Sequence, residues 1–135
     1  MDAKVDLELL YQRAWAAREK AYAPYSKFLV GAALLTQSGE IFDGCNVENV
    51  SLGLTLCAER AAAAAAVQSG HQQFIAIAVA ADTRVPVVPC GACRQFLAEF
   101  NAELLVYSVG KGYEQRAWSL LQLLPYPRDG ILDCG

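Results

Sequence analysis

The segment Phe74–Ala81, FIAIAVAA, is an unbroken apolar run rich in Ile, Val and Ala. It lacks the alternation of apolar and polar residues that marks a strand with one face in water. It is also far shorter than the roughly 20 apolar residues that a helix needs to cross a bilayer. The segment therefore predicts a strand buried on both faces, in a sheet that is covered by helices.

The segments on either side of this strand alternate between helical and extended patterns. Residues 58–68 are strongly helical and include six consecutive alanines, whereas Ser38-Gly39 is a turn signal between two extended runs. Strands that alternate with helices imply an α/β fold with a sheet between helical layers, and we expect one domain over residues 1–135. The predicted helices cover 5–21, 58–68, 91–100 and 115–124, and the predicted strands cover 28–36, 40–45, 74–81 and 103–107.

Charge and composition exclude several classes of function. Eleven Lys and Arg against fourteen Asp and Glu give a net charge of −3, so the basic surface typical of nucleic-acid binding is missing. The charged first residues lack the apolar core of a signal peptide, which favours a cytoplasmic protein without a membrane anchor. Structural disulfides are rare in that compartment, so the five cysteines need another explanation. The 55% apolar content suggests that partner subunits cover part of the surface.

Two short cysteine motifs each stand at the start of a predicted helix. They are CAER at 57–60 and PCGAC at 89–93. Unpaired N–H groups at a helix N-terminus favour the thiolate, which is the form that binds metal. The C-x-x-C spacing lets Cys90 and Cys93 reach one ion, and Cys57 would be a third ligand. Zinc with three protein ligands and an open fourth position is the catalytic arrangement.

The residues beside Cys57 suit catalysis at such a zinc ion. Glu59 is in the same helical turn, where its carboxylate could exchange protons with the metal's water without ligating the metal. Three thiolates and one Zn²⁺ sum to −1, and Arg60 is placed to donate to a thiolate and offset this charge. The pair C-x-E and P-C-x-x-C matches the signature of zinc deaminases in its three-cysteine form.

Other roles for these cysteines remain open from the pattern alone. A single C-x-x-C motif is also typical of a structural zinc knuckle or a redox pair. Cys45 or Cys134 could supply a fourth ligand and close the site, although a buried small residue and a tail thiol are the simpler interpretations. A redox pair would leave Cys57 and Glu59 without a role, which disfavours it.

Four motifs occur in order along most of the chain, from about residue 21 to residue 125. They are YSKFLVGAA at 25–33, GCNVEN at 44–49, CAER at 57–60 and PCGACRQ at 89–95, followed by LLP at 123–125. In these segments the chain resembles the small homotetrameric cytidine deaminases. The resemblance implies a three-layer α/β/α sandwich on a mixed five-stranded sheet, a zinc cofactor, and active sites completed by neighbouring subunits.

The resemblance also implies substrate contacts for five positions. Phe28 would stack on the pyrimidine, and Asn46 and Glu48 would hydrogen-bond the ribose hydroxyls. The backbone N–H of Ala58 would bind the carbonyl oxygen of the base, and the carbonyl of Val88 would accept from the departing amine. An aromatic face suits a flat base, and a carboxylate with an amide suits a sugar diol.

The reaction implied is zinc-dependent hydrolysis of cytidine and 2′-deoxycytidine to the uridines and ammonia, within pyrimidine salvage. Glu59 would contact ring N3 and the amino group while it moves protons. A sister deaminase of another cytosine nucleoside and a binding module with a structural zinc are the alternatives. A polynucleotide deaminase is disfavoured by the net charge of −3.

Two positions depart from the family pattern at the rim of the pocket. The family commonly has an aromatic residue where this chain has Leu52, before Gly53. It commonly has Phe three places after the proline of the LLP motif, where this chain has Arg128. We expect zinc chemistry to be unaffected and the rim to be roomier or more polar, so that cytidines with N4 substituents are tolerated.

Overall fold

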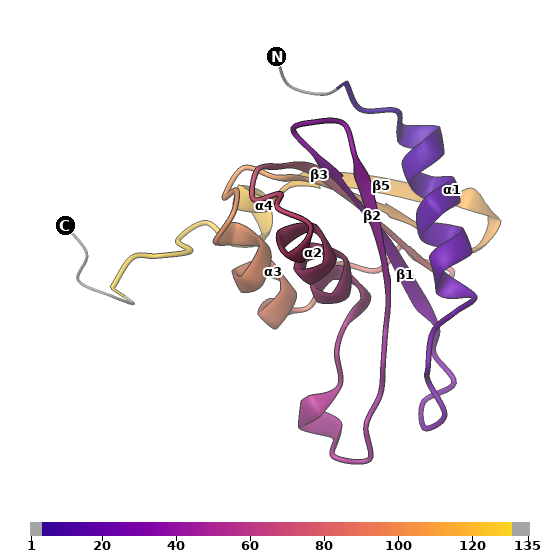
Figure 1. Ribbon diagram of the computed structural model, residues 1–135. Helices are drawn as coiled ribbons and strands as arrows, with labels where there is room; N and C mark the ends of the chain where they lie inside the picture. The colour runs from indigo at the N-terminus through magenta and orange to yellow at the C-terminus, as the bar shows by residue number, and fades with distance from the viewer. Residues whose placement is uncertain (1–3, 131–135) are drawn as a thin grey trace.

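The computed structural model describes residues 4–130 and contains one five-stranded sheet with the strand order β2-β1-β3-β4-β5 (Figure 1). Strands β3 and β4 are parallel and the other neighbouring pairs are antiparallel, so the sheet is mixed, as expected. The strands are β1 Val30–Thr36, β2 Ile41–Cys45, β3 Phe74–Ala81, β4 Leu105–Val109 and β5 Gln115–Ser119. The helices are α1 Leu7–Arg18, α2 Ala58–Gln68, α3 Gly91–Ala98 and α4 Leu120–Leu123, with short 3₁₀ turns at Leu52–Leu54 and Lys111–Tyr113.

Helices cover both faces of this sheet, which gives the three layers of an α/β/α sandwich (Figure 1). One apolar cluster joins α1 to one face, and a second joins α2 and α3 to the other. Strand β3 contributes to both clusters: Ala76 and Ala78 belong to the α1 cluster, and Phe74 and Ile77 to the α2 cluster. The prediction of a strand at 74–81 with both faces buried is therefore confirmed.

Two glycines allow the helices to lie directly on the sheet. A Cβ atom at Gly31 in β1 would be 1.9 Å from the carbonyl oxygen of Ala14 in α1. One at Gly44 in β2 would be 2.4 Å from both the carbonyl oxygen of Ala58 and the backbone nitrogen of Ala62 in α2. Because Gly44 has no side chain, the first turn of α2, which carries the CAER motif, can lie directly against β2. No larger residue fits at this position.

The predicted helix over 115–124 is wrong, because its first half is the edge strand β5. Gly112 has a φ of 73°, a left-handed conformation that lets the chain turn back alongside β4. Most of β5 is exposed, so its sequence lacks the apolar signal of a central strand. A capping box between Ser119 and Gln122 then starts α4, which is only one turn long.

A long loop over residues 46–56 extends away from the sheet before α2 begins (Figure 1). Its two ends are held together by a bridge between Val47 and Leu56, and Val47 also pairs with Tyr22. Within residues 4–130, none of the helices has the length and apolar character that a bilayer crossing requires.

Candidate active site

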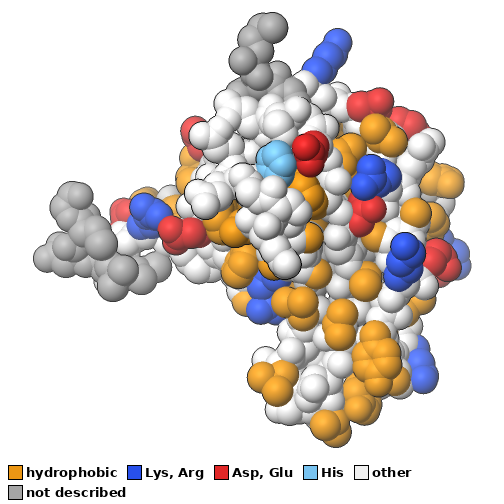
Figure 2. Space-filling view, in the orientation of Figure 1, with side chains coloured by type: hydrophobic (Ala, Val, Ile, Leu, Met, Phe, Trp, Pro, Cys, Tyr) orange, Lys and Arg blue, Asp and Glu red, His pale blue; other side chains and the backbone are white. Residues whose placement is uncertain are grey.

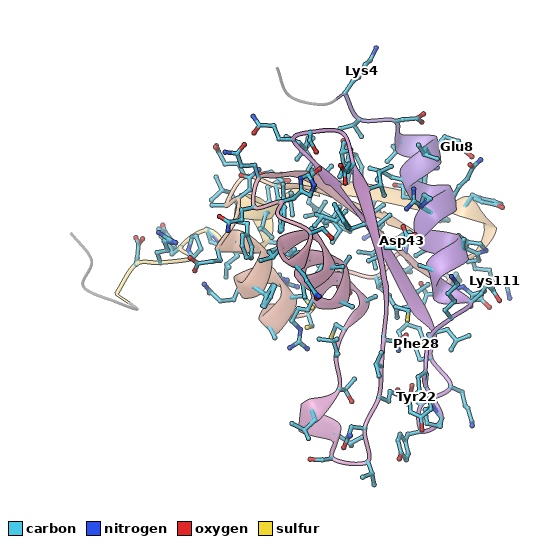
Figure 3. All side chains as sticks on the ribbon, in the orientation of Figure 1. Lys4, Glu8, Tyr22, Phe28, Asp43 and Lys111 are labelled. Atoms are coloured by element: carbon cyan, nitrogen blue, oxygen red, sulfur yellow. The ribbon has the colours of Figure 1, made fainter. Side chains whose placement is uncertain are left out.

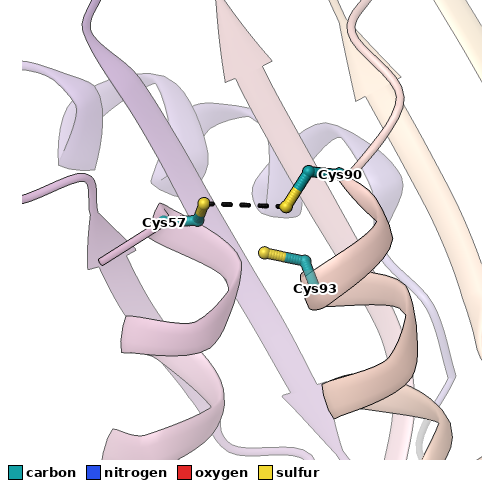
Figure 4. A group of neighbouring side chains, drawn as sticks. All are labelled: Cys57, Cys90 and Cys93. Carbon is teal, nitrogen blue, oxygen red and sulfur yellow. Dashed lines mark hydrogen bonds between the residues drawn. The ribbon is translucent and has the colours of Figure 1, made fainter. Parts of the chain in front are cut away.

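The three motif cysteines meet in space although they come from two helices. Cys57 is the N-cap residue of α2, Cys90 is the N-cap residue of α3, and Cys93 lies in the first turn of α3. Their sulfur atoms all lie within 4.8 Å of one another, and the Sγ atoms of Cys57 and Cys90 are 3.8 Å apart. Figure 4 shows the three thiols directed toward one another.

This spacing fits a zinc ion. Zinc binds cysteine sulfur at about 2.3 Å with tetrahedral geometry, which places two ligand sulfurs about 3.8 Å apart. Three such sulfurs leave a fourth tetrahedral position for a further group. The donor set is therefore suited to zinc, and Cys57, Cys90 and Cys93 would hold it.

The cluster is electrostatically prepared for a cation. Hydrogen bonds from Cys93 and Arg60 lower the pKa of the Cys57 thiol to about 5. The hydrogen bond that Cys93 gives to Cys57 and the burial of its thiol raise the pKa of Cys93, and repulsion from the charges of Glu59 and Cys57 adds to this. A divalent cation removes that repulsion and allows all three groups to ionise.

The guanidinium of Arg60 contacts this cluster directly. Its Nη2 donates to the Sγ of Cys57 at 3.4 Å and to the carbonyl of Thr55 at 3.3 Å. The thiolate contact expected from the sequence is thus present. Its effect on zinc stays a prediction.

Replacing Arg60 by alanine should weaken zinc binding by about 10- to 100-fold, the usual cost of losing a partner behind a metal ligand. The positive charge that stabilises the Cys57 thiolate is lost, and the excess negative charge of the cluster is no longer offset. Competition with a chelator measures the change in zinc affinity. Arg13→Ala, which removes a partly exposed salt bridge to Asp43 on the sheet, is the control. Unchanged zinc affinity and turnover in Arg60→Ala would show that Arg60 has no tuning role.

Glu59 is the second residue of α2 and only 5% exposed. Burial raises the pKa of its carboxyl group to about 7. A carboxyl group in this range both takes up and releases protons near neutral pH, which suits general acid–base chemistry. One residue, Ala58, separates it from Cys57, so Glu59 lies in the first turn of α2, directly after the cysteine that caps this helix.

The segment that carries Phe28 is hydrogen-bonded to the loop that leads into Cys57. The side-chain amide of Asn46 donates to the carbonyl of Phe28 at 2.7 Å, and the next residue, Val47, pairs with Leu56. Leu56 directly precedes Cys57 in the chain. Phe28 itself lies just before β1 begins and is 41% exposed (Figure 3).

Glu48 lies on the 46–56 loop, where its carboxylate accepts the backbone N–H groups of Tyr25 and Ser26. Two further predicted residues lie beside the helix starts. Ala58 is the first residue of α2 and fully buried, and Val88 is partly exposed before Pro89 in the loop that leads to Cys90. Arg94, to which the sequence analysis gave no role, holds this loop: its Nε donates to the carbonyl of Pro89 at 2.7 Å. Only its position in the PCGACRQ motif could have indicated it.

Cys45 does not join the three motif cysteines as a fourth ligand. It lies at the end of β2, where its thiol donates to the carbonyl of Lys20 at 3.6 Å. Within residues 4–130, the group suited to a metal ion consists of the three motif cysteines alone. Cys134 lies outside the described residues.

A three-thiolate cluster at two helix N-termini, with a buried glutamate in the same turn as one ligand, defines the class of zinc-dependent deaminases. The sequence model of a protein family, described as the cytidine and deoxycytidylate deaminase zinc-binding region, matches residues 4–109 of this chain. The chain therefore belongs to this family of zinc-dependent deaminases.

Named relatives agree with this assignment. The chain is 49% identical over 122 residues to a cytidine deaminase of Sporosarcina psychrophila, covering 90% of each chain. It is 47% identical over 103 residues to a cytidine deaminase of Mycobacterium tuberculosis, covering 76% of this chain and 77% of the relative. The crystal structure of a Burkholderia pseudomallei cytidine deaminase superposes with a TM-score of 0.86 at 48% identity, covering 90% of this chain and 98% of that one.

Proposed function

We propose that this protein hydrolyses the 4-amino group of cytidine and 2′-deoxycytidine, giving uridine or 2′-deoxyuridine and ammonia. The observation that carries the proposal is the cysteine cluster at two helix starts, with buried Glu59 in the first turn of α2. The similarity to relatives named cytidine deaminase supports the choice of substrate.

The catalytic roles follow from the chemistry of each group. Cys57, Cys90 and Cys93 would hold zinc, which supplies a Lewis acid that makes water a nucleophile near neutral pH. Glu59 takes a proton from the attacking water and passes it to ring N3. It then delivers a second proton to the amino nitrogen, which leaves as ammonia while water's oxygen remains on C4.

Five residues would position the nucleoside. The ring of Phe28 stacks on the base, and Asn46 and Glu48 bind the ribose. The N–H of Ala58, at the buried start of α2, donates to the base carbonyl oxygen. The carbonyl of Val88, before the Pro89 loop, accepts from the departing amine.

An ultraviolet assay on zinc-loaded protein tests this function. Cytidine and 2′-deoxycytidine should lose absorbance as they become uridines, with one ammonia released per nucleoside. Turnover of a different cytosine nucleoside, with neither of these used, would favour a sister deaminase. No ammonia from any cytosine nucleoside would favour a binding module with a structural zinc.

We also propose that cytidines with small N4 substituents are accepted. Leu52 is 72% exposed on the 46–56 loop, and Arg128 is turned toward Glu99, with which it forms a 2.9 Å salt bridge. Neither residue offers the aromatic wall that the family pattern has at these two places.

The prediction is that Leu52→Tyr lowers the use of N4-methylcytidine relative to cytidine by about tenfold, a typical selectivity for one methyl group. The ratio of the two kcat/KM values measures it. Leu121→Tyr on α4, also a partly exposed leucine, is the control. Equal ratios in the unmutated protein and in Leu52→Tyr would contradict the proposed rim.

The biological setting we propose is pyrimidine salvage by a cytoplasmic homotetramer. Exposed apolar side chains gather on the 46–56 loop and beside it, where Figure 2 shows a dense hydrophobic area at the base of the molecule. A patch of this kind favours self-association. The residues concerned are Tyr22, Tyr25, Val47, Val50, Leu52 and Leu54. The cytoplasm keeps thiols reduced, as the metal cluster requires.

A further inference from the structure

The hydroxyl group of Ser26 connects two residues of the proposed substrate site. The backbone N–H of Phe28 donates to the Oγ of Ser26 at 3.0 Å. The same hydroxyl donates its proton to the carboxylate of Glu48. A serine hydroxyl has one proton to give and two lone pairs, so one atom satisfies both contacts.

The turn that contains Ser26 needs such support. Lys27, between Ser26 and Phe28, has a φ of 61°, the left-handed conformation that non-glycine residues disfavour. The carboxylate of Glu48 stabilises this turn, because it also accepts hydrogen bonds from the backbone N–H groups of Tyr25 at 3.0 Å and Ser26 at 3.1 Å. The Lys27 N–H closes the turn on the carbonyl of Ala23 at 3.0 Å, and the contacts to Glu48 tie it to a carboxylate 22 residues farther along the chain.

Phe28 is not held by the sheet itself. It precedes β1, and its carbonyl is bound by the Asn46 side chain rather than by a neighbouring strand. The Oδ1 of Asn46 also accepts the N–H of Val30 at 2.9 Å. Both backbone polar groups of Phe28 are thus bound by side chains, Ser26 on one side and Asn46 on the other.

The charge of Glu48 fixes the direction of these bonds. The hydrogen bond from the Ser26 side chain is the largest of the contacts that lower the pKa of this carboxyl group, and nearby Lys27 adds to it. The ionised carboxylate only accepts, so the Ser26 proton is directed to it. The hydroxyl oxygen is then free to accept from Phe28.

We propose that Ser26 is a positioning residue for substrate binding, because it locks the ring of Phe28 and the carboxylate of Glu48 into one arrangement. This inference rests on the proposed function. Without the hydroxyl, the Phe28 N–H loses its partner and the turn is freer to move. Binding should suffer, whereas kcat should not, since Glu59 and the cysteines lie on α2 and α3.

Steady-state kinetics of the zinc-loaded protein with cytidine test this role. Ser26→Ala should raise KM about tenfold, the size of one lost hydrogen bond to a charged group, and keep kcat within about twofold. Ser26→Thr keeps a hydroxyl and should restore most of the affinity. Ser38→Ala is the control: it also removes a bonded hydroxyl, 3.0 Å from the Oγ1 of Thr36, but at the opposite end of β1.

The outcomes separate this inference from the proposed function. If the unmutated protein does not deaminate cytidine, the proposed function fails. If it does, and Ser26→Ala leaves KM unchanged or lowers kcat instead, the positioning role is overturned. Amide exchange at Phe28 should quicken in Ser26→Ala, and unchanged exchange also contradicts the proposal. If Ser26→Ala does not fold, Ser26→Cys takes its place in both measurements, because a thiol fills the space but is a weak donor.

Discussion

Glu59→Gln is expected to lower kcat for cytidine by about 10²- to 10⁴-fold, the usual contribution of general acid–base catalysis. Glutamine has nearly the same shape as glutamate but cannot take up or release a proton. The carboxyl group is buried, so no solvent base reaches the same place in the first turn of α2. Stopped assays with high enzyme concentrations measure the residual rate.

Zinc content is the second measurement for this variant. The group suited to a metal ion consists of Cys57, Cys90 and Cys93 and does not include Glu59. Glu59→Gln should therefore keep about one zinc per chain. Glu103→Gln, which alters an exposed carboxylate before β4, is the control and should retain full activity. A Glu59→Gln protein with kcat close to that of the unmutated protein would remove Glu59 from the mechanism.

Cys93→Ser is expected to reduce zinc affinity by more than about 100-fold and to abolish turnover. A partner behind a ligand already contributes 10- to 100-fold, and a ligand itself contributes more. A serine hydroxyl stays protonated at neutral pH and is a poor ligand for zinc. Cys93 is fully buried, so water cannot easily replace its sulfur. Metal analysis after dialysis measures the loss.

The stabilising effect of zinc gives an independent readout. A metal that binds only the folded chain raises its apparent stability, so added zinc should raise the Tm of the unmutated protein and not that of Cys93→Ser. Cys45→Ser is the matched control, since Cys45 lies outside the cluster and should retain zinc. Loss of zinc in Cys45→Ser, or its retention in Cys93→Ser, would show that the ligand set is different.

Local sequence patterns gave the best predictions. The strand at 74–81 and the helix at 58–68 have the bounds that their periodicity and apolar runs indicate. The edge strand β5 was missed, because most of its residues are exposed and its pairing with β4 is a contact between segments. The contact between Ser26 and Glu48 was missed for a similar reason, since the two residues are 22 positions apart in the chain.

The sequence by itself determined the chemistry that this protein can perform. Residue types and spacings within one helical turn are local properties, so CAER and PCGAC already indicated thiolates and a carboxylate at helix starts. Only the tertiary structure decided that the sulfur atoms of Cys57 and Cys90, 33 residues apart, lie 3.8 Å from each other. That distance depends on how closely α2 packs at Gly44 and on how Arg94 holds the loop before α3. Packing of this kind joins remote segments, and no short stretch of sequence encodes it.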